Sequence, residues 1–203
     1  MYKLCFSLCL AIVLSLTAAG ASVSAQELDL RASLGGGINF GYAGGINIPF
    51  ELDLGWRFNP YVGLYLDLSY EYTDRSISRG DEIPIGDRHA LFFIPSLRIF
   101  MYENDIASVY ATFGLGINVT PCELVRDGSA RNKTTILSFL SSKFQIGADF
   151  HVTSRFWLGF AFTSHYNFYE TYNDKYNSEK TTKWLHGTTT TFSLLMVASY
   201  RFL

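Results

Sequence analysis

Six charged residues could interact with one another, because most of them are separated by an even number of positions along the chain. In an extended chain, even spacing puts side chains on one face. A turn centred on Pro60 would place Asp53 opposite Asp67, and two close carboxylates repel unless a cation lies nearby. We therefore predict one network in which Arg98 bridges the acids, with water between the charges as the alternative. The members are Glu51, Asp53, Arg57, Asp67, Glu71 and Arg98.

The histidines are the residues best suited to catalysis or metal binding. Ser164 and His165 are adjacent, so on a strand they point to opposite faces and a nucleophile cannot reach its base. His151 shares a parity with Thr153, but no acidic residue is placed to orient its imidazole. No Cys or carboxylate stands at metal-ligand spacing from either lumen-parity histidine. We expect no catalytic residue, no metal and no cofactor.

The composition excludes two broad classes. Of the 203 residues, 48% are hydrophobic and 17% are charged, which is too apolar for a disordered chain. The 16 Lys and Arg residues against 18 Asp and Glu residues give a formal net charge of -2. Nucleic-acid binding usually needs an excess of basic residues, so we expect no nucleic-acid partner.

Residues 1–25 have the features of a cleaved secretory signal peptide. Lys3 provides a positive charge before an apolar run that ends at Thr17, and the small residues Val23-Ser24-Ala25 suit a signal peptidase. An uncleaved anchor is the alternative, but the run is short for a membrane span of roughly 20 residues. The remaining chain, 26–203, is predicted to be one domain.

Apolar and polar residues alternate through most of this domain. From Leu28 to Tyr42, apolar side chains share one parity with a single Gly among them, and Gly, Ser, Asn and charged residues fill the other. This period of two indicates a strand and excludes a helix. The pattern recurs seven more times, less cleanly in the fourth segment. The predicted strands cover about 28–42, 48–58, 62–73, 90–102, 107–119, 140–151, 156–168 and 191–202.

The connections between these strands alternate in length. Three of them, at 59–61, 103–105 and 153–155, have about three residues each. Three others, at 74–89, 121–138 and 170–188, are long and polar. Short turns at one end and long loops at the other are typical of barrels that cross the bacterial outer membrane. The predicted fold is therefore all-β, an eight-stranded antiparallel up-and-down transmembrane β-barrel that follows a cleaved N-terminal signal peptide.

A soluble barrel or sandwich is the main alternative. It predicts Lys and Glu on the polar face, because charge keeps exposed strands soluble. Here that face is mostly Gly, Ser, Thr and Asn. Aromatic residues also gather near strand ends, as in interfacial girdles. Those at the short-turn side are Phe58, Phe156, Trp157 and Phe202, and those at the loop side are Tyr42, Tyr70, Tyr72, Tyr166, Phe168 and Tyr169.

The chain resembles the small eight-stranded outer-membrane barrels, the group that contains outer membrane proteins A, X and W and the opacity proteins. The likeness covers about 28–203 and rests on strand count, loop alternation, the segment Val109-Tyr110-Ala111-Thr112-Phe113-Gly114-Leu115-Gly116, and the ending Ala198-Ser199-Tyr200-Arg201-Phe202-Leu203. It implies location in the bacterial outer membrane, contact with its lipid, and recognition of the C-terminal strand by the barrel-insertion machinery. The family's last strand normally ends on an aromatic residue, whereas here Phe202 is penultimate.

Three functions compete. The long loops combine charges with aromatics, as suits contact with an extracellular ligand or host surface, so we rank a role in the envelope and in surface interaction first. A channel for small hydrophobic molecules, as in the outer membrane protein W branch, is second, and an enzyme that modifies lipid A is a remote third. Apolar residues of lumenal parity favour the channel, although a narrow lumen also needs side chains to fill it. They are Phe92, Ile94, Phe100, Trp157, Leu195 and Val197.

Overall fold

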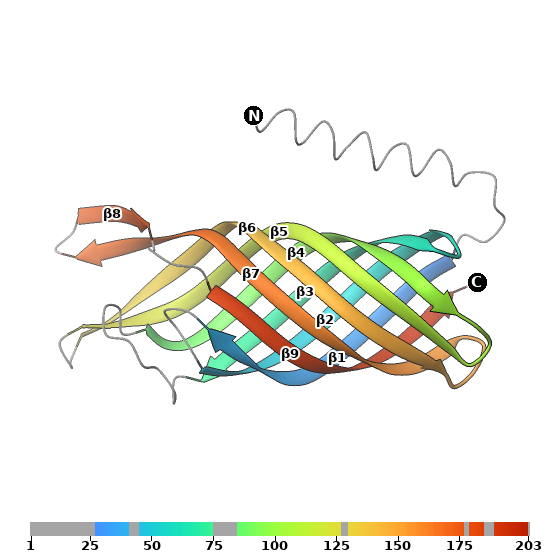
Figure 1. Cartoon of the computed structure of the whole chain (residues 1–203). Coiled ribbons are helices and arrows are strands. Elements are labelled where there is room, and N and C mark those ends of the chain that lie inside the picture. Colours follow the sequence, from blue (N-terminus) through green and yellow to red (C-terminus); the bar gives the residue numbers. More distant parts are fainter. Residues whose placement is uncertain are drawn as a thin grey trace, which may run out of the picture.

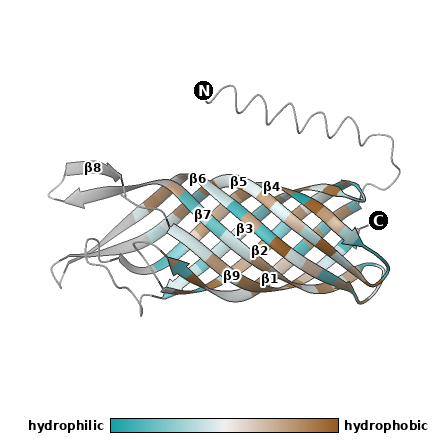
Figure 2. Ribbon diagram, viewed as in Figure 1, coloured by the Kyte–Doolittle hydropathy of each residue, from teal (hydrophilic) through white to brown (hydrophobic). Residues whose placement is uncertain are grey.

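Over most of the barrel, every second side chain along a strand points into the lumen, and the next one points outward. The computed structural model describes residues 27–40, 45–74, 85–126, 130–176, 179–184 and 189–202. The predicted signal peptide and Tyr42 lie outside these residues. On the last strand, Leu195 is fully buried while its neighbour Met196 is 74% exposed. The outward positions form an apolar belt, as the alternating hydropathy in Figure 2 shows.

The structure contains nine strands among the described residues (Figure 1). They are β1 (Glu27–Phe40), β2 (Gly45–Asn59), β3 (Val62–Asp74), β4 (Ile85–Glu103), β5 (Ala107–Arg126), β6 (Ala130–His151), β7 (Phe156–Tyr176), β8 (Glu179–Trp184) and β9 (Thr189–Phe202).

Eight of these strands form a closed antiparallel barrel. Each of β1 to β5 pairs with the next strand, β6 pairs with β7, β7 pairs with β9, and β9 pairs with β1. The predicted eight-stranded barrel is confirmed. Asp53 lies opposite Asp67, as the turn at Pro60 predicted. No helix in the described part of the chain is long and apolar enough to cross a membrane.

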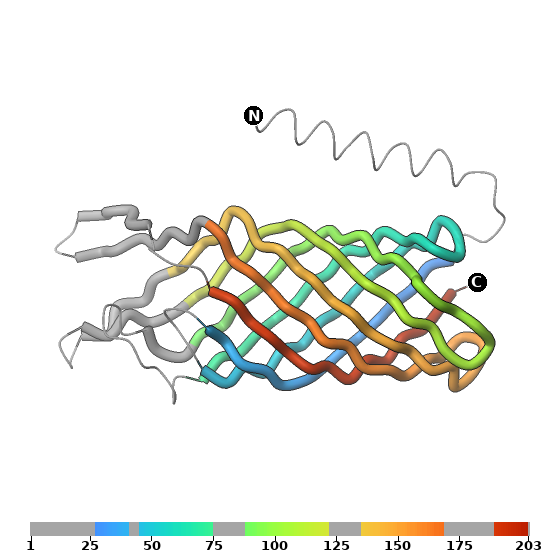
Figure 3. Tube along the Cα trace, viewed as in Figure 1, coloured from blue at the N-terminus to red at the C-terminus, as the bar shows by residue number. Residues whose placement is uncertain are grey.

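The three short turns lie together at the barrel end where the chain finishes (Figure 3). At the other end, two predicted loops are wrong in part, because the strands continue into them. β5 and β6 stay paired as far as Arg126 and Ala130, within the predicted loop 121–138. β7 continues to Tyr176 and pairs with the added strand β8, within the predicted loop 170–188. β4 also begins earlier than predicted, at Ile85.

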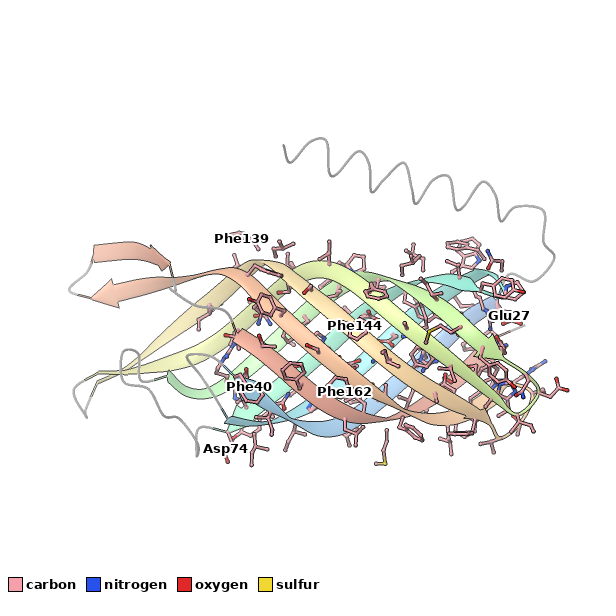
Figure 4. The ribbon with its side chains drawn as sticks, viewed as in Figure 1. Glu27, Phe40, Asp74, Phe139, Phe144 and Phe162 are labelled. Carbon is pink, nitrogen blue, oxygen red and sulfur yellow. The ribbon has the colours of Figure 1, made fainter. Side chains whose placement is uncertain are left out.

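A bulge in β6 changes which of its residues face the lumen. Gly116 pairs with Ser141 and Asn118 pairs with Ser138, so β6 has one more residue than β5 at this point. The extra residue makes Phe139 and Leu140 follow each other on the outside. Figure 4 shows Phe139, Phe144 and Phe162 on the outer face.

Candidate functional site: the charged interior of the barrel

Lys143 of β6 lies at the centre of the charged interior. Its Nζ donates to Glu51 Oε2 at 2.7 Å, and it lies 3.7 Å from Asp53 Oδ1 and 3.6 Å from Asp67 Oδ2. Gln145, two residues along the same strand, donates to the same Glu51 oxygen at 3.2 Å. The Lys143 side chain has no solvent exposure. One ammonium group therefore holds together three carboxylates from β2 and β3.

Arg98 of β4 closes the space beside this lysine. Its Nη2 donates to Asp53 Oδ2 at 2.9 Å, and its Nε donates to Thr112 Oγ1 at 2.8 Å. The guanidinium carbon lies 3.9 Å from the ring centre of Tyr65 and 4.6 Å from that of Tyr110. Because the cation is stacked on two aromatic rings and hydrogen-bonded at its edge, its position is well defined.

A histidine and a glutamate form the layer on the side of the long hairpins. His165 Nδ1 donates to Glu71 Oε1 at 2.6 Å, and Thr191 Oγ1 donates to the other carboxylate oxygen at 3.2 Å. The Phe92 ring stacks on the imidazole with centres 4.5 Å apart. His165 is almost fully buried. Ser164, which precedes it, is outward-facing, so the two residues do lie on opposite faces of β7.

On the side of the short turns, a second arginine is paired with one acid. Arg31 donates to both carboxylate oxygens of Asp149, at 2.6 and 3.0 Å, and to the Tyr110 hydroxyl at 2.7 Å. The Tyr65 hydroxyl donates to Asp29 Oδ2 at 2.6 Å. The rings of Tyr65 and Tyr110 therefore pack against Arg98, and their hydroxyl groups are hydrogen-bonded to Asp29 and Arg31 of the layer nearer the short turns.

Four charged residues occupy the lumen end next to the short turns. Arg57 pairs with Glu103 through Nη1 at 3.1 Å and lies 3.9 Å from Glu27. Arg201 of β9 lies 2.9 Å from Glu27 of β1. Its guanidinium covers the ring of Trp157 at 3.8 Å. This end of the lumen is therefore bounded by ion pairs and an aromatic ring.

The predicted charge network is divided among these layers. Arg98 reaches one of the four predicted acids, Asp53, rather than bridging them all. Arg57 belongs to the short-turn end, because it lies on β2 four residues beyond Asp53, too far along the strand to reach the acids. Glu71 pairs with His165. Lys143 was absent from the predicted network, although its inward parity was a usable signal.

The six predicted apolar residues all face the lumen, but they do not line one path. Their side-chain contacts divide them among four separate clusters. Phe92 and Ile94 cluster with Ala90, Phe100 clusters with Tyr65 and Tyr110, Leu195 and Val197 cluster with Ala161, and Trp157 stacks on His151. The residues proposed as a possible apolar path therefore lie in separate clusters along the lumen.

The charged side chains of the interior cross-link the strands of the barrel. The charged side chains contact one another across the lumen, and each layer joins strands that are not neighbours in the sheet. Among the described residues, no group of three or more His, Cys, Asp or Glu side chains is arranged to hold a metal ion. The arrangement fixes the strands relative to one another and fills the middle of the lumen.

Comparisons with known proteins agree with this architecture. A family model, the outer membrane protein beta-barrel domain, matches residues 11–202. No curated protein matches the sequence. Among solved structures, Neisserial surface protein A aligns with a TM-score of 0.59 and 11% identity, over 86% of this chain and 97% of that one.

Two further structures align over the whole of their own chains. A major outer membrane protein from Thermus thermophilus has a TM-score of 0.54 and 15% identity, over 88% of this chain. The Yersinia pestis attachment invasion locus protein Ail, in complex with the heparin analogue sucrose octasulfate, has a TM-score of 0.52 and 13% identity, also over 88% of this chain. These likenesses show the fold.

A closed antiparallel barrel with an apolar outside and a polar inside is an integral membrane protein of the bacterial outer membrane. This chain belongs to the outer membrane protein beta-barrel family. The end with the short turns therefore faces the periplasm, and the end with the long hairpins faces the outside of the cell.

Proposed function

We propose that this chain is a surface-recognition protein of the cell envelope, whose extracellular hairpins bind a ligand outside the cell while its lumen stays closed. The observation that carries this proposal is the length of the hairpins. The β5–β6 pairing continues for seven residue pairs from Thr120 with Ile136 to Arg126 with Ala130. At about 3.4 Å per residue, these pairs extend about 20 Å.

The hairpins also offer free strand edges. The β6–β7 pairing ends at Ile136 with Tyr172, whereas β7 continues to Tyr176 and pairs there with β8 only. Among the described residues, β8 has one pairing partner. An unpaired strand edge presents backbone donors and acceptors that an extended peptide can complete. This geometry supports a protein ligand, and the Ail complex shows that a barrel of this fold has been seen with a sulfated sugar.

The filled lumen favours recognition over permeation. Lys143 and Arg98 lie at mid-barrel with no exposed surface, and the apolar side chains are divided into separate clusters. We therefore propose that hydrophobic molecules do not pass along the lumen. We also propose that the chain is not an enzyme, which is supported by the opposite facing of Ser164 and His165. Assembly is proposed to depend on recognition of β9, which carries Phe202 on its outer face, by the barrel-insertion machinery.

A hairpin-shortened protein tests this function. Replacing residues 122–134 by Asn-Gly, and separately 173–182 by Asn-Gly, removes the projecting pairs but keeps the membrane-spanning strands. Proteoliposomes with each protein are applied to arrays of immobilised extracellular proteins and sulfated glycans. We expect the full chain to bind at least one array member and a shortened chain to lose that binding. Equal binding by all three would refute the proposal, as would conduction of an apolar solute by the full chain.

A further inference from the structure

A histidine on the outer, lipid-facing surface of the barrel is not explained by the closed lumen or by the hairpins. His89 of β4 is exposed and lies opposite Tyr72 of β3. Its Nδ1 is hydrogen-bonded to the Tyr70 hydroxyl at 2.7 Å. The imidazole centre lies 6.0 Å from the ring of Tyr70 and 5.4 Å from that of Tyr72. The three rings form one cluster, the outer histidine cluster, made of Tyr70, Tyr72 and His89.

The height of this cluster in the membrane follows from the strand length. Met101 is outward-facing at the periplasmic end of β4, and a tilted strand crosses the hydrocarbon layer in about 9–11 residues. Counting back along β4 from Met101, the hydrocarbon layer ends near Leu91. His89 is the next outward residue, so the cluster lies at the level of the lipid headgroups in the outer leaflet. Asp74, exposed at the end of β3 (Figure 4), lies further out.

The chemistry of the cluster suits an anionic headgroup oxygen. An imidazole is costly to place against hydrocarbon unless both ring nitrogens have partners. The described contacts engage Nδ1, and Nε2 is the ring nitrogen left for a ligand. When the Tyr70 hydroxyl donates to Nδ1, Nε2 carries the ring hydrogen and can donate to a phosphate oxygen. The tyrosine hydroxyl thereby fixes the direction in which Nε2 donates.

We propose that the outer histidine cluster is a binding site for the phosphate of an outer-leaflet lipid. His89 provides the donor, Tyr70 orients the imidazole, and the Tyr72 ring packs beside it. The site lies on the outside of β3 and β4, on the face of the sheet opposite the lumen and at the base of the β5–β6 hairpin, where Arg88 pairs with Cys122. It binds a membrane lipid rather than the extracellular ligand of the proposed surface recognition, and it gives the barrel a preferred lipid neighbour at one position on its circumference.

Lipid retention measured by native mass spectrometry tests this site. The refolded full chain in dodecyl maltoside micelles is titrated with diacyl phosphatidic acid and, separately, with a galactosyl diacylglycerol that has the same acyl chains. We expect the protein to retain one phosphatidic acid molecule in preference to the galactolipid. His89→Phe keeps an outward aromatic ring but removes the donor, so it should weaken retention about tenfold. Tyr70→Phe should weaken it less.

Two controls keep the result interpretable. Leu91→Phe changes the next outward position of the same strand and should leave retention unchanged. Each variant must show the same heat-dependent gel mobility as the wild type, which confirms that its barrel is folded. Equal retention by wild type and His89→Phe would overturn the proposal, as would a preference for the galactolipid. Displacement of the lipid by excess inorganic phosphate would assign the site to the free ion instead.

Discussion

The buried Lys143 ammonium is shielded from bulk solvent, and carboxylates from three residues surround it. Such a group stabilises the fold only while its partners are present, because a charge left unpaired in the interior is costly. The same reasoning applies to the acids, which would repel each other if the lysine were removed.

We therefore expect Lys143→Met to destabilise the barrel by about 3–5 kcal/mol, because three carboxylates lose their shared cation. The free energy of unfolding is measured by urea titration in lipid vesicles. Arg155→Met, at an exposed position in a periplasmic turn, is the control and should change the free energy by less than about 0.5 kcal/mol. If the two variants unfold at the same urea concentration, Lys143 does not hold the acids together.

Two glycines make room for the tyrosines that enclose Arg98. A methyl group on Gly55 would collide with the Tyr65 ring, and one on Gly147 would collide with the Tyr110 hydroxyl. By contrast, a methyl group on Gly36, which faces outward, would meet nothing within 4 Å. The pairing of glycine with a bulky residue across the strands is therefore a packing requirement of the lumen.

Gly55→Ala should consequently cost about 1–3 kcal/mol of unfolding free energy, since Tyr65 must move off the Arg98 guanidinium. Gly36→Ala is the matched variant, with the same chemical change on the outer face of a neighbouring strand, and should leave stability nearly unchanged. Urea titrations of both variants check this. A larger loss for Gly36→Ala than for Gly55→Ala would contradict the assigned facing.

Parity identified the inward residues, but it could not identify their partners across the lumen. Asp53 and Asp67 are neighbours in one hairpin, so the turn at Pro60 was enough to pair them. Lys143 meets the same acids from β6, and that contact depends on the strand tilt and stagger of the whole barrel. A sequence carries no local signal for such a contact, so Arg98 was predicted to make it.

At the level of the strand, the lipid belt determines which substitutions a β-strand tolerates. Met196 of β9 is 74% exposed on the outer face, between Leu194 and Ala198 at the neighbouring outward positions. A charge placed there would lie in hydrocarbon, where no water or counter-ion can compensate for it.

Met196→Arg should therefore destabilise the barrel by about 2–4 kcal/mol, the cost of arginine near the bilayer midplane. Met196→Leu conserves volume and apolarity and should change the free energy by less than about 1.5 kcal/mol. A folding titration into vesicles of defined lipid measures both. Equal folding of the two variants would place β9 outside the lipid belt.

The same belt explains why the spanning strands could be predicted from the sequence and their extensions could not. Within the membrane, lipid on one side and a polar lumen on the other impose alternation. Above the membrane, both faces of a strand meet water, so residues 122–134 show no period of two. Hairpin pairing there depends on backbone hydrogen bonds between β5 and β6, which leave no hydrophobic pattern.

For the molecule as a whole, the proposed closure of the lumen has a measurable electrical consequence. The wild-type barrel in a planar bilayer should show no stable single-channel current, because Arg98, Lys143 and two tyrosines fill its middle. Arg98→Ala removes the guanidinium between Tyr65 and Tyr110 and should produce discrete openings. Arg57→Ala is the control, since Arg57 lies at the periplasmic end. Currents through the wild type, or none through Arg98→Ala, would contradict this view of the lumen.

The strand pairing that closes the barrel joins residues from opposite ends of the chain, with Leu28 opposite Phe202. β1 is synthesised before all the other strands of the barrel and β9 after them, so the free edge of β1 has no partner until β9 has been made. Export and delivery to the outer membrane must therefore handle a chain that is still open. A chain truncated before β9 would form a sheet that cannot close, and its unpaired edges would favour proteolysis over insertion into the membrane.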